Sequence, residues 1–159
     1  MAVATCAVLS VAALPVPPLA QADNARLNKS VVANVITLQQ QAGCQATIKI
    51  NPKLRLAAQW QTEDVLNNQA LDGDIGSDGS TAQDRAKNAG YVGAVSETVA
   101  INPALAINNL EILNQWYYRA DYYKIMTDCS NRDIGVWSEN SFDRSVVVAV
   151  YGKGDDSAH

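Results

Sequence analysis

The feature of this sequence that most constrains its fold is an unbroken apolar segment near the carboxyl end. Residues 146–150 read VVVAV, and Ser145 and Tyr151 flank them. Alternate side chains of a strand point to opposite faces of a sheet, so a strand without polar alternation is covered on both faces. We therefore predict a strand over Ser145–Tyr151 within a sheet that has helices on both sides. A partner strand is predicted at Ile134–Ser138, with a turn around residues 140–143 between the two.

The first 70 residues predict two helices. The first is capped by Asp23 or Asn24 and ends near Gly43; the second starts with Asn51 as its cap and runs toward Asn67. Apolar residues recur at helical spacing in both segments, which gives each helix one buried face. The buried positions expected are Leu27, Val31, Val35 and Leu38 in the first helix, and Leu54, Ala58, Val65 and Leu66, with Trp60 beside them, in the second.

A third helix is predicted from the pair Asn102-Pro103, which repeats the start signal of the second. Its apolar residues step by four, three and four, the clearest amphipathic pattern in the chain. An aromatic run at its end predicts core packing, with a ligand groove as the alternative. The stripe is Ala106, Leu110, Leu113 and Tyr117, and the aromatic run is Trp116, Tyr117, Tyr118, Tyr122 and Tyr123.

The stretch Leu71–Ala100 opens with a polar loop. Glycines alternate with Asp and Ser over residues 72–79, which is typical of a chain reversal, because glycine tolerates positive φ and short polar side chains bond nearby amides. Ser80 and Gln83 then form a capping-box pattern that predicts a short helix. The loop is therefore expected to deliver the chain into a helix over Ala82–Ala89.

Gly90 follows this helix at the position where a left-handed cap is wanted. Tyr91–Ala100 then reads as an extended segment of small and apolar residues that presents one carboxyl group, Glu97.

The same stretch resembles the signature of bacterial domains of the CAP superfamily, also called SCP-like. The pattern there has a His four residues before Asp-Gly, then Ser-Thr, Arg, Ala-Gly-Tyr and a Glu. The resemblance extends over about residues 51–152 and implies an α/β fold, an α-β-α sandwich with a small, mainly antiparallel sheet. The matching residues are Asp78, Gly79, Ser80, Thr81, Arg85, Ala89, Gly90, Tyr91 and Glu97.

The chain departs from this family at two functional positions. Asp74 stands where the family has its first His, and Tyr122 stands where it has a second His, six residues after Trp116. The resemblance implies a divalent-cation site at a His/Glu cleft, and that site does not transfer intact, because Tyr122 is a poor ligand for common divalent ions. We therefore expect a degenerate cleft formed by Asp74, Glu97 and Tyr122.

Catalytic and metal chemistry have few candidates. The only histidine is His159, the last residue, which excludes most histidine-based catalytic schemes. The acidic loop fails the EF-hand pattern, so a divalent cation at Asp74 and Glu97 is only an alternative to the absence of a cofactor. Repulsion between these two carboxylates would raise one pKa and permit acid/base work. The structural role is preferred, in which Glu97 accepts backbone N–H bonds or pairs with Arg85 and so holds the cleft loops together.

The amino-terminal segment predicts an export signal. Residues 1–22 carry no charge, are apolar from Val3 to Leu14 and end in Ala-Gln-Ala, a small-residue cleavage pattern. A membrane anchor is the alternative, but prolines interrupt the run of about 20 apolar residues that a span needs. We expect a signal peptide at 1–22, one domain at 23–152 and a flexible tail at 153–159. The protein would be secreted or held at the cell envelope, with no transmembrane segment after cleavage.

Cleavage would remove Cys6 and leave Cys44 and Cys129. An even pair in an exported protein predicts one disulfide, with two buried thiols as the alternative. Nucleic acid is not an expected partner, because 12 basic residues face 16 acidic ones, the net charge is −4, and no basic run is present.

Three functions are compatible with these features. The first is an exported, non-catalytic binding module with a cleft that lacks histidine and with an unknown protein or lipid partner. The second is a lipid or sterol carrier with a groove at Leu110, Leu113 and Tyr117. The third is a hydrolase that acts on a cell-envelope substrate through Asp74 and Glu97.

Overall fold

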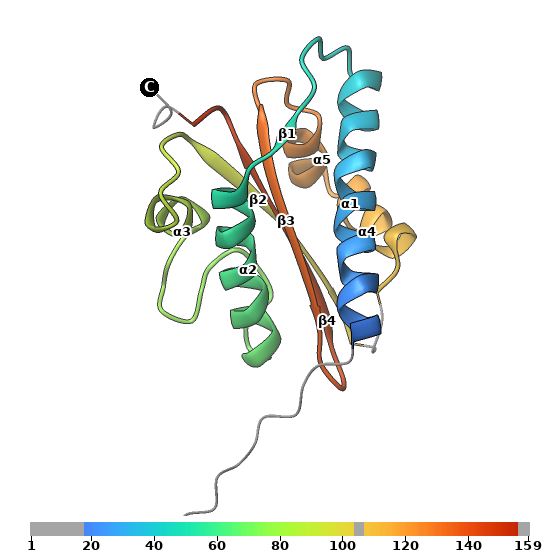
Figure 1. Ribbon diagram of the computed structural model, residues 1–159, viewed down its shortest axis with the longest axis vertical. Coiled ribbons are helices and arrows are strands. Elements are labelled where there is room, and N and C mark those ends of the chain that lie inside the picture. The colour runs from blue at the N-terminus through green and yellow to red at the C-terminus, as the bar shows by residue number, and fades with distance from the viewer. Residues whose placement is uncertain (1–17, 104–106, 156–159) are drawn as a thin grey trace, which may run out of the picture.

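The computed structural model describes the backbone of residues 18–103 and 107–155, with side chains from residue 23 onward. Most of the predicted signal peptide therefore lies outside the described residues, as do Ala106 and His159. This part of the chain forms five helices and four strands, and Figure 1 shows how they are arranged. Their bounds are α1 Pro18–Gln41, β1 Lys49–Ile50, α2 Pro52–Asn67, α3 Ala82–Asn88, β2 Val95–Asn102, α4 Asn109–Tyr117, α5 Ala120–Met126, β3 Asp133–Asn140 and β4 Ser145–Gly152.

The predicted α-β-α sandwich is confirmed. The strands form one sheet in the order β1-β3-β4-β2, with β1 parallel to β3 and the other two pairs antiparallel. Figure 1 shows this sheet nearly edge-on, with α2 and α3 on one side and α1, α4 and α5 on the other. The sheet is therefore mainly antiparallel and covered on both faces.

The apolar segment that predicted this architecture is β4, and every residue of the strand is buried. The two sets of alternate side chains enter two separate hydrophobic clusters. Val147, Ala149 and Tyr151 join the cluster under α1, α4 and α5, and Val146, Val148 and Val150 join the one under α2. Each face of the strand thus contributes to its own core.

Helix α2 has the bounds that the sequence predicts. The Asn51 side chain accepts hydrogen bonds from the backbone N–H groups of Lys53 (2.9 Å) and Leu54 (3.4 Å). The helix packs so closely on β3 that a Cβ at Gly135 would clash with the backbone of Leu54 and Arg55. The prediction for Trp60 is wrong: its side chain is 37% exposed, because it lies on the flank of the helix away from the cluster.

The predicted third helix starts too early. Residues up to Asn102 pair with β4 as strand β2, so the Asn-Pro signal ends a strand and cannot start a helix. Helix α4 begins at Asn109, where Asn108 and Glu111 form the capping box. Its buried residues are Ile112 and Trp116; Leu110 and Tyr117 of the predicted stripe are exposed. The core packing predicted for the aromatic run is therefore confirmed for Trp116 and Tyr122 and wrong for Tyr117, Tyr118 and Tyr123, which are exposed.

Two other boundaries differ from expectation. Helix α1 begins at Pro18, so neither Asp23 nor Asn24 caps it, and it ends two residues before Gly43 as predicted. The capping box of α3 is one residue later than predicted, with Thr81 and Asp84 in place of Ser80 and Gln83. Gly90 has φ +88° after this helix, which confirms the left-handed cap.

The segment expected to form a loose tail contacts the body of the domain at its start. Gly154 N–H donates to the Tyr91 hydroxyl (2.9 Å), and Asp155 pairs with Lys53 (2.7 Å). Lys153 pairs with Asp128 (2.6 Å). Residues 156–159 of the tail lie outside the described residues.

The predicted disulfide is present. Cys44 and Cys129 are bonded across 85 sequence positions and join the loop after α1 to the loop after α5. No helix in the described part of the chain is both long and apolar enough to cross a membrane.

Candidate functional site

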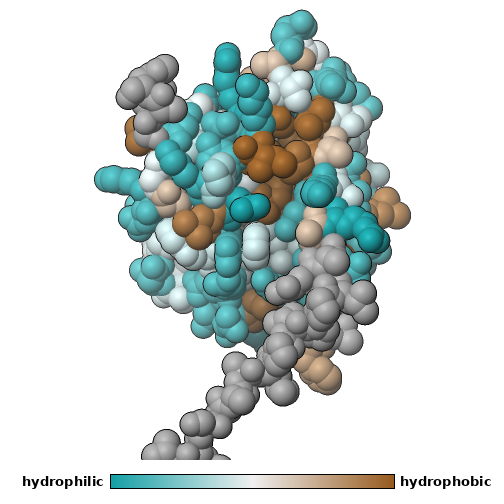
Figure 2. Space-filling model, viewed as in Figure 1, coloured by the Kyte–Doolittle hydropathy of each residue, from teal (hydrophilic) through white to brown (hydrophobic). Residues whose placement is uncertain are grey.

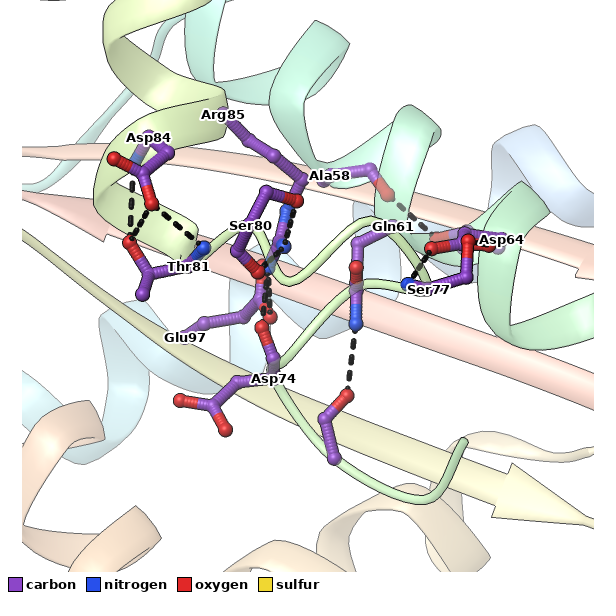
Figure 3. A network of polar contacts seen from close by, with 12 residues as sticks. Ala58, Gln61, Asp64, Asp74, Ser77, Ser80, Thr81, Asp84, Arg85 and Glu97 are labelled. Carbon is purple, nitrogen blue, oxygen red and sulfur yellow. Dashed lines mark hydrogen bonds and ion pairs between the residues drawn. The ribbon is translucent and has the colours of Figure 1, made fainter. Parts of the chain in front are cut away.

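The loop before α3 is held in place by side chains of α2 (Figure 3). The Asp64 carboxylate accepts hydrogen bonds from the backbone N–H and the hydroxyl of Ser77, both at 2.7 Å. Gln61 is fully buried and donates to the Gly73 carbonyl at 2.8 Å. Gly76 lies where a side chain would collide with Ser80. These contacts give the loop one defined path across the end of α2.

Asp78 has the turn role that the sequence predicts. Its carboxylate accepts from the Ser80 backbone N–H at 2.9 Å, and the Ser80 side chain, followed by this backbone group, lowers the pKa of Asp78. Asp78 therefore shapes the loop and does not line the cleft described below.

Arg85 on α3 connects the loop to the sheet. Its guanidinium donates to the carbonyls of Ser80 (2.8 Å) and Asp74 (2.7 Å) and to Glu97 Oε1 (2.9 Å). Arg85 is only 5% exposed, and Figure 3 shows it between the loop and β2. The predicted pairing of Glu97 with Arg85 is thus present, and it fixes the positions of three separate segments.

Glu97 is the buried acid of the site. It is 5% exposed, and while Oε1 accepts from Arg85, Oε2 has no hydrogen-bond partner among the described residues. Burial raises the pKa of Glu97 to about 8; Arg85 partly offsets this effect and Asp74 adds to it. The sequence predicted a raised pKa through repulsion by Asp74, but burial is the larger cause because it removes water from the carboxylate.

An open cleft of about 610 Å³ brings the three predicted residues together, since Asp74, Glu97 and Tyr122 all line it. The described residues that line it carry four carboxyl groups, those of Asp72, Asp74, Glu97 and Asp121, and one guanidinium group. Asp72 and Asp74 are exposed, and in Figure 3 the Asp74 carboxylate points away from Arg85. The cleft is therefore acidic.

Tyr122 has a structural contact that the family's histidine position did not suggest. The Tyr122 side chain is 7% exposed, and its phenol lies beside the backbone of Val99 on β2. Burial raises the pKa of Tyr122, so the phenol stays neutral and is a weak metal ligand. Tyr122 thus covers part of the outer edge of β2.

The sequence prediction missed two charged residues of the cleft. Arg119 lies over the Tyr122 ring, 3.6 Å from its centroid, and its guanidinium pairs with Asp121 at 2.7 Å. Arg119 precedes Tyr122 by three positions, which is the helical spacing that brings side chains together. This spacing is visible in the sequence and could have predicted the contact between Arg119 and Tyr122.

The fold family implies a divalent metal in this cleft, and the residues present do not fit one. Asp74 and Glu97 supply carboxylates, but the Arg85 cation is bonded to Glu97 and repels a second cation at that oxygen. Within the described ranges, no group of three or more His, Cys, Asp or Glu side chains gathers as a metal site. Because Asp74 and Tyr122 stand at the family's two histidine positions, the cleft lacks the nitrogen donors that zinc sites use.

Comparison with known proteins gives matches only among solved structures; no family model and no curated protein matches the chain. The chain is similar to an extracellular protein containing an SCP domain from Bacillus anthracis, with TM-score 0.70 and 13% identity over 89% of this chain and 45% of that one. It is also similar to an outer surface protein from Borrelia burgdorferi, with TM-score 0.66 and 14% identity over 78% of this chain and 90% of that one.

A third similar structure is a cysteine-rich secretory protein from Staphylococcus aureus, with TM-score 0.59 and 10% identity over 82% of this chain and 39% of that one. This chain thus spans less than half of the Bacillus and Staphylococcus chains. At these identities the likeness concerns the fold. This likeness shows that the chain has the fold of the CAP superfamily, the SCP-like domain.

Proposed function

We propose that this chain is an exported, non-catalytic binding module that holds a positively charged group of its ligand in the cleft at Asp74, Glu97 and Tyr122. One observation carries the proposal: Glu97 lines an acidic cleft and has a buried oxygen without a partner. The pKa of about 8 leaves this carboxyl protonated at neutral pH, and a cationic donor such as an ammonium or guanidinium group would favour its ionised form and bond the free oxygen.

The charge of the cleft supports a cationic ligand. Glu97 is bonded to Arg85 and is protonated at neutral pH because its pKa is about 8, and Arg119 pairs with Asp121. Asp72 and Asp74 then remain as two exposed carboxylates with no ion pair in the described part of the chain. Opposite charge attracts a ligand and orients it, even where it contributes modestly to affinity.

The same residues argue against catalysis. The described residues that line the cleft include neither histidine nor cysteine, and Glu97 is held by Arg85. A hydroxyl nucleophile needs a base that is free to take its proton, and the Asp84 carboxylate beside the Thr81 hydroxyl (2.7 Å) is already engaged in the capping box of α3. Export is supported by the signal-like segment 1–22, by the Cys44–Cys129 disulfide, and by similar structures that are described as extracellular or outer-surface proteins.

Titration of isotope-labelled protein, followed by nuclear magnetic resonance, tests this function. The probes are spermidine, the tripeptide acetyl-Gly-Lys-Gly-amide and, for comparison, acetate, all at one ionic strength. We expect both cations to shift the amide signals of Asp74, Glu97 and Tyr122, and acetate to leave them unchanged. Asp74→Asn should weaken binding at least threefold. Asp23→Asn, an exposed change of equal charge on α1, serves as the control. Equal shifts with acetate, or no shifts with either cation, would contradict the proposal.

A hydrolase remains the alternative from another class, and one observation favours it: the pKa of about 8 keeps Glu97 protonated at neutral pH, as a general acid requires. Turnover of purified peptidoglycan by the protein, lost in Glu97→Gln with the fold intact, would establish it.

The lipid-carrier hypothesis has less support, because Leu110 and Tyr117 line neither this cleft nor the groove described next. A co-purifying lipid in native mass spectrometry would revive it.

A further inference from the structure

The outer edge of β3 is open over most of its length. Strand β1 pairs only with Asp133 and Ile134, whereas β3 continues to Asn140 without a further strand beside it in the described part of the chain. The Asn51 backbone N–H donates to the Ile134 carbonyl at 2.9 Å, so Ile134 faces outward. Alternate residues share this direction, and the backbone groups of Val136 and Ser138 therefore also face outward.

A groove of about 340 Å³ lies along this open edge, between α1 and α2. Figure 2 shows apolar surface gathered between these helices in the same view as Figure 1. Its apolar lining comes from Val32 on α1, Ile50 on β1, and Val136 and Trp137 on β3. Ile50 is 58% exposed, although it belongs to the sheet. None of these residues lines the acidic cleft, so the groove is a separate surface.

The rim of the groove is basic. Lys29 on α1 and Arg55 on α2 line it from opposite sides, and neither forms an ion pair within the described ranges. The single acid of the lining, Glu139, accepts a hydrogen bond from Trp137 Nε1 at 3.1 Å. Asn28 adds a buried Oδ1 without a partner. The groove therefore offers two free cations, one free acceptor and an open strand edge.

We propose that this groove binds an extended acidic peptide, which adds as a strand beside β3. An extended segment supplies the N–H and C=O groups that an open edge lacks. Its alternate side chains would reach Val32 and Val136 on one face of the sheet and Trp137 on the other, and an Asp or Glu would meet Lys29 and Arg55. An acyl chain would contact only the apolar residues of the groove and would leave the N–H and C=O groups of the β3 edge unpaired.

A second copy of this chain is a poorer occupant. The edge is recessed between two helices, whereas edge-to-edge pairing of two sheets requires each edge to project beyond its covering layers. A single peptide strand is narrow enough to enter between α1 and α2.

Selection from a phage-displayed library of random 12-residue peptides on the purified protein tests the proposal. Enriched peptides should alternate apolar residues and contain Asp or Glu. The double variant Lys29→Glu/Arg55→Glu should weaken their binding at least tenfold. The double variant Lys87→Glu/Lys124→Glu changes exposed residues away from the groove by the same charge and should leave the affinity within twofold.

Amide hydrogen exchange then distinguishes strand addition from other modes of binding. In the free protein, the amides of Val136 and Ser138 should exchange faster than those of Gly135 and Trp137, which face β4. A bound peptide should slow exchange at Val136 and Ser138 at least tenfold. The proposal is overturned if no acidic peptide is enriched, or if peptides bind without protecting these amides. It also fails if sodium dodecanoate, and no peptide, shifts the signals of the groove residues.

Discussion

The two edges of the sheet differ in how they are closed. Along the outer edge of β2, the Gln83 side chain accepts from the Val95 N–H at 3.0 Å, and Gln115 bonds both backbone groups of Ile101 at 3.1–3.2 Å. The buried Tyr122 side chain lies beside the Val99 backbone between them. Along β3, no strand continues beyond the two residues of β1 in the described part of the chain. Side chains thus close one edge and leave the other open.

This difference accounts for the character of the two surfaces. On β2, Gln83 and Tyr122, two of the side chains that cover the edge, line the cleft together with the buried acid Glu97. The surface at this edge is therefore a polar cleft. On β3 the backbone itself is available, and the groove over it is apolar with a basic rim. An edge strand invites pairing unless it is protected, and among the residues with described positions only the β2 edge is protected. Opposite charges on the two surfaces would keep their ligands distinct.

The largest expected effect on stability is at Arg85, which bonds Glu97 on β2, the strand with the closed edge. Arg85→Met should lower the free energy of unfolding by about 3–5 kcal/mol, because it removes the partner of a buried acid and the hydrogen bonds that hold the loop. Urea unfolding measures the change. Lys87→Met on the exposed side of the same helix should change it by less than about 0.5 kcal/mol. A loss below about 1 kcal/mol in Arg85→Met would mean that the pair does not organise the cleft.

The next largest effect on stability is expected at Gly135 on β3, the strand with the open edge. Gly135→Ala should destabilise the protein by about 1–3 kcal/mol, since the added methyl group forces α2 away from β3. Gly73→Ala is the matched control, because a Cβ there meets nothing within 4 Å. Thermal unfolding of both variants would sharpen the comparison. Equal stability of the two would show that α2 does not hold the open strand by close contact.

The pH dependence of stability isolates Glu97. Its pKa is raised to about 8 by burial, so its contribution to stability is fully present below the unfolded-state value near 4.5 and is lost as pH rises through 8. The stability of Glu97→Gln relative to the natural protein should therefore rise between pH 5 and pH 8, by up to about 1.4 kcal/mol per pH unit. Urea unfolding at several pH values measures this slope. A difference that is independent of pH would show that Glu97 titrates normally.

The smallest expected effect on stability is at Gln115, one of the side chains that cover the β2 edge. Gln115→Ala should cost about 1 kcal/mol, because both backbone groups of Ile101 lose their partner. The Ile101 amide should also exchange faster with solvent, as the amides of the open edge do. Gln59→Ala removes an exposed bond to Glu63 and is the control. Unchanged exchange at Ile101 would mean that Gln115 does not close the edge.

The sequence predicted the centre of the fold better than its margins. The VVVAV segment predicted a doubly covered strand because burial on both faces leaves no polar position. Pairing with Arg85 was one of the two structural roles predicted for Glu97, and it is the one observed. The start of α4 was mispredicted because pairing of β2 with β4 overrides the local Asn-Pro signal. The groove on β3 was not predicted, since the brevity of β1 becomes apparent only when the strands are paired.

The most direct test of the cleft as a cation site is the titration of the Glu97 side-chain carboxyl, observed by its ¹³C signal. In the free protein we expect a midpoint near pH 8. Spermidine should lower this midpoint by at least one pH unit, because a bound cation favours the ionised carboxylate. Asp23→Asn should leave both values unchanged. A midpoint near 4.5, or a midpoint near 8 that spermidine does not move, would contradict the proposed role of the cleft.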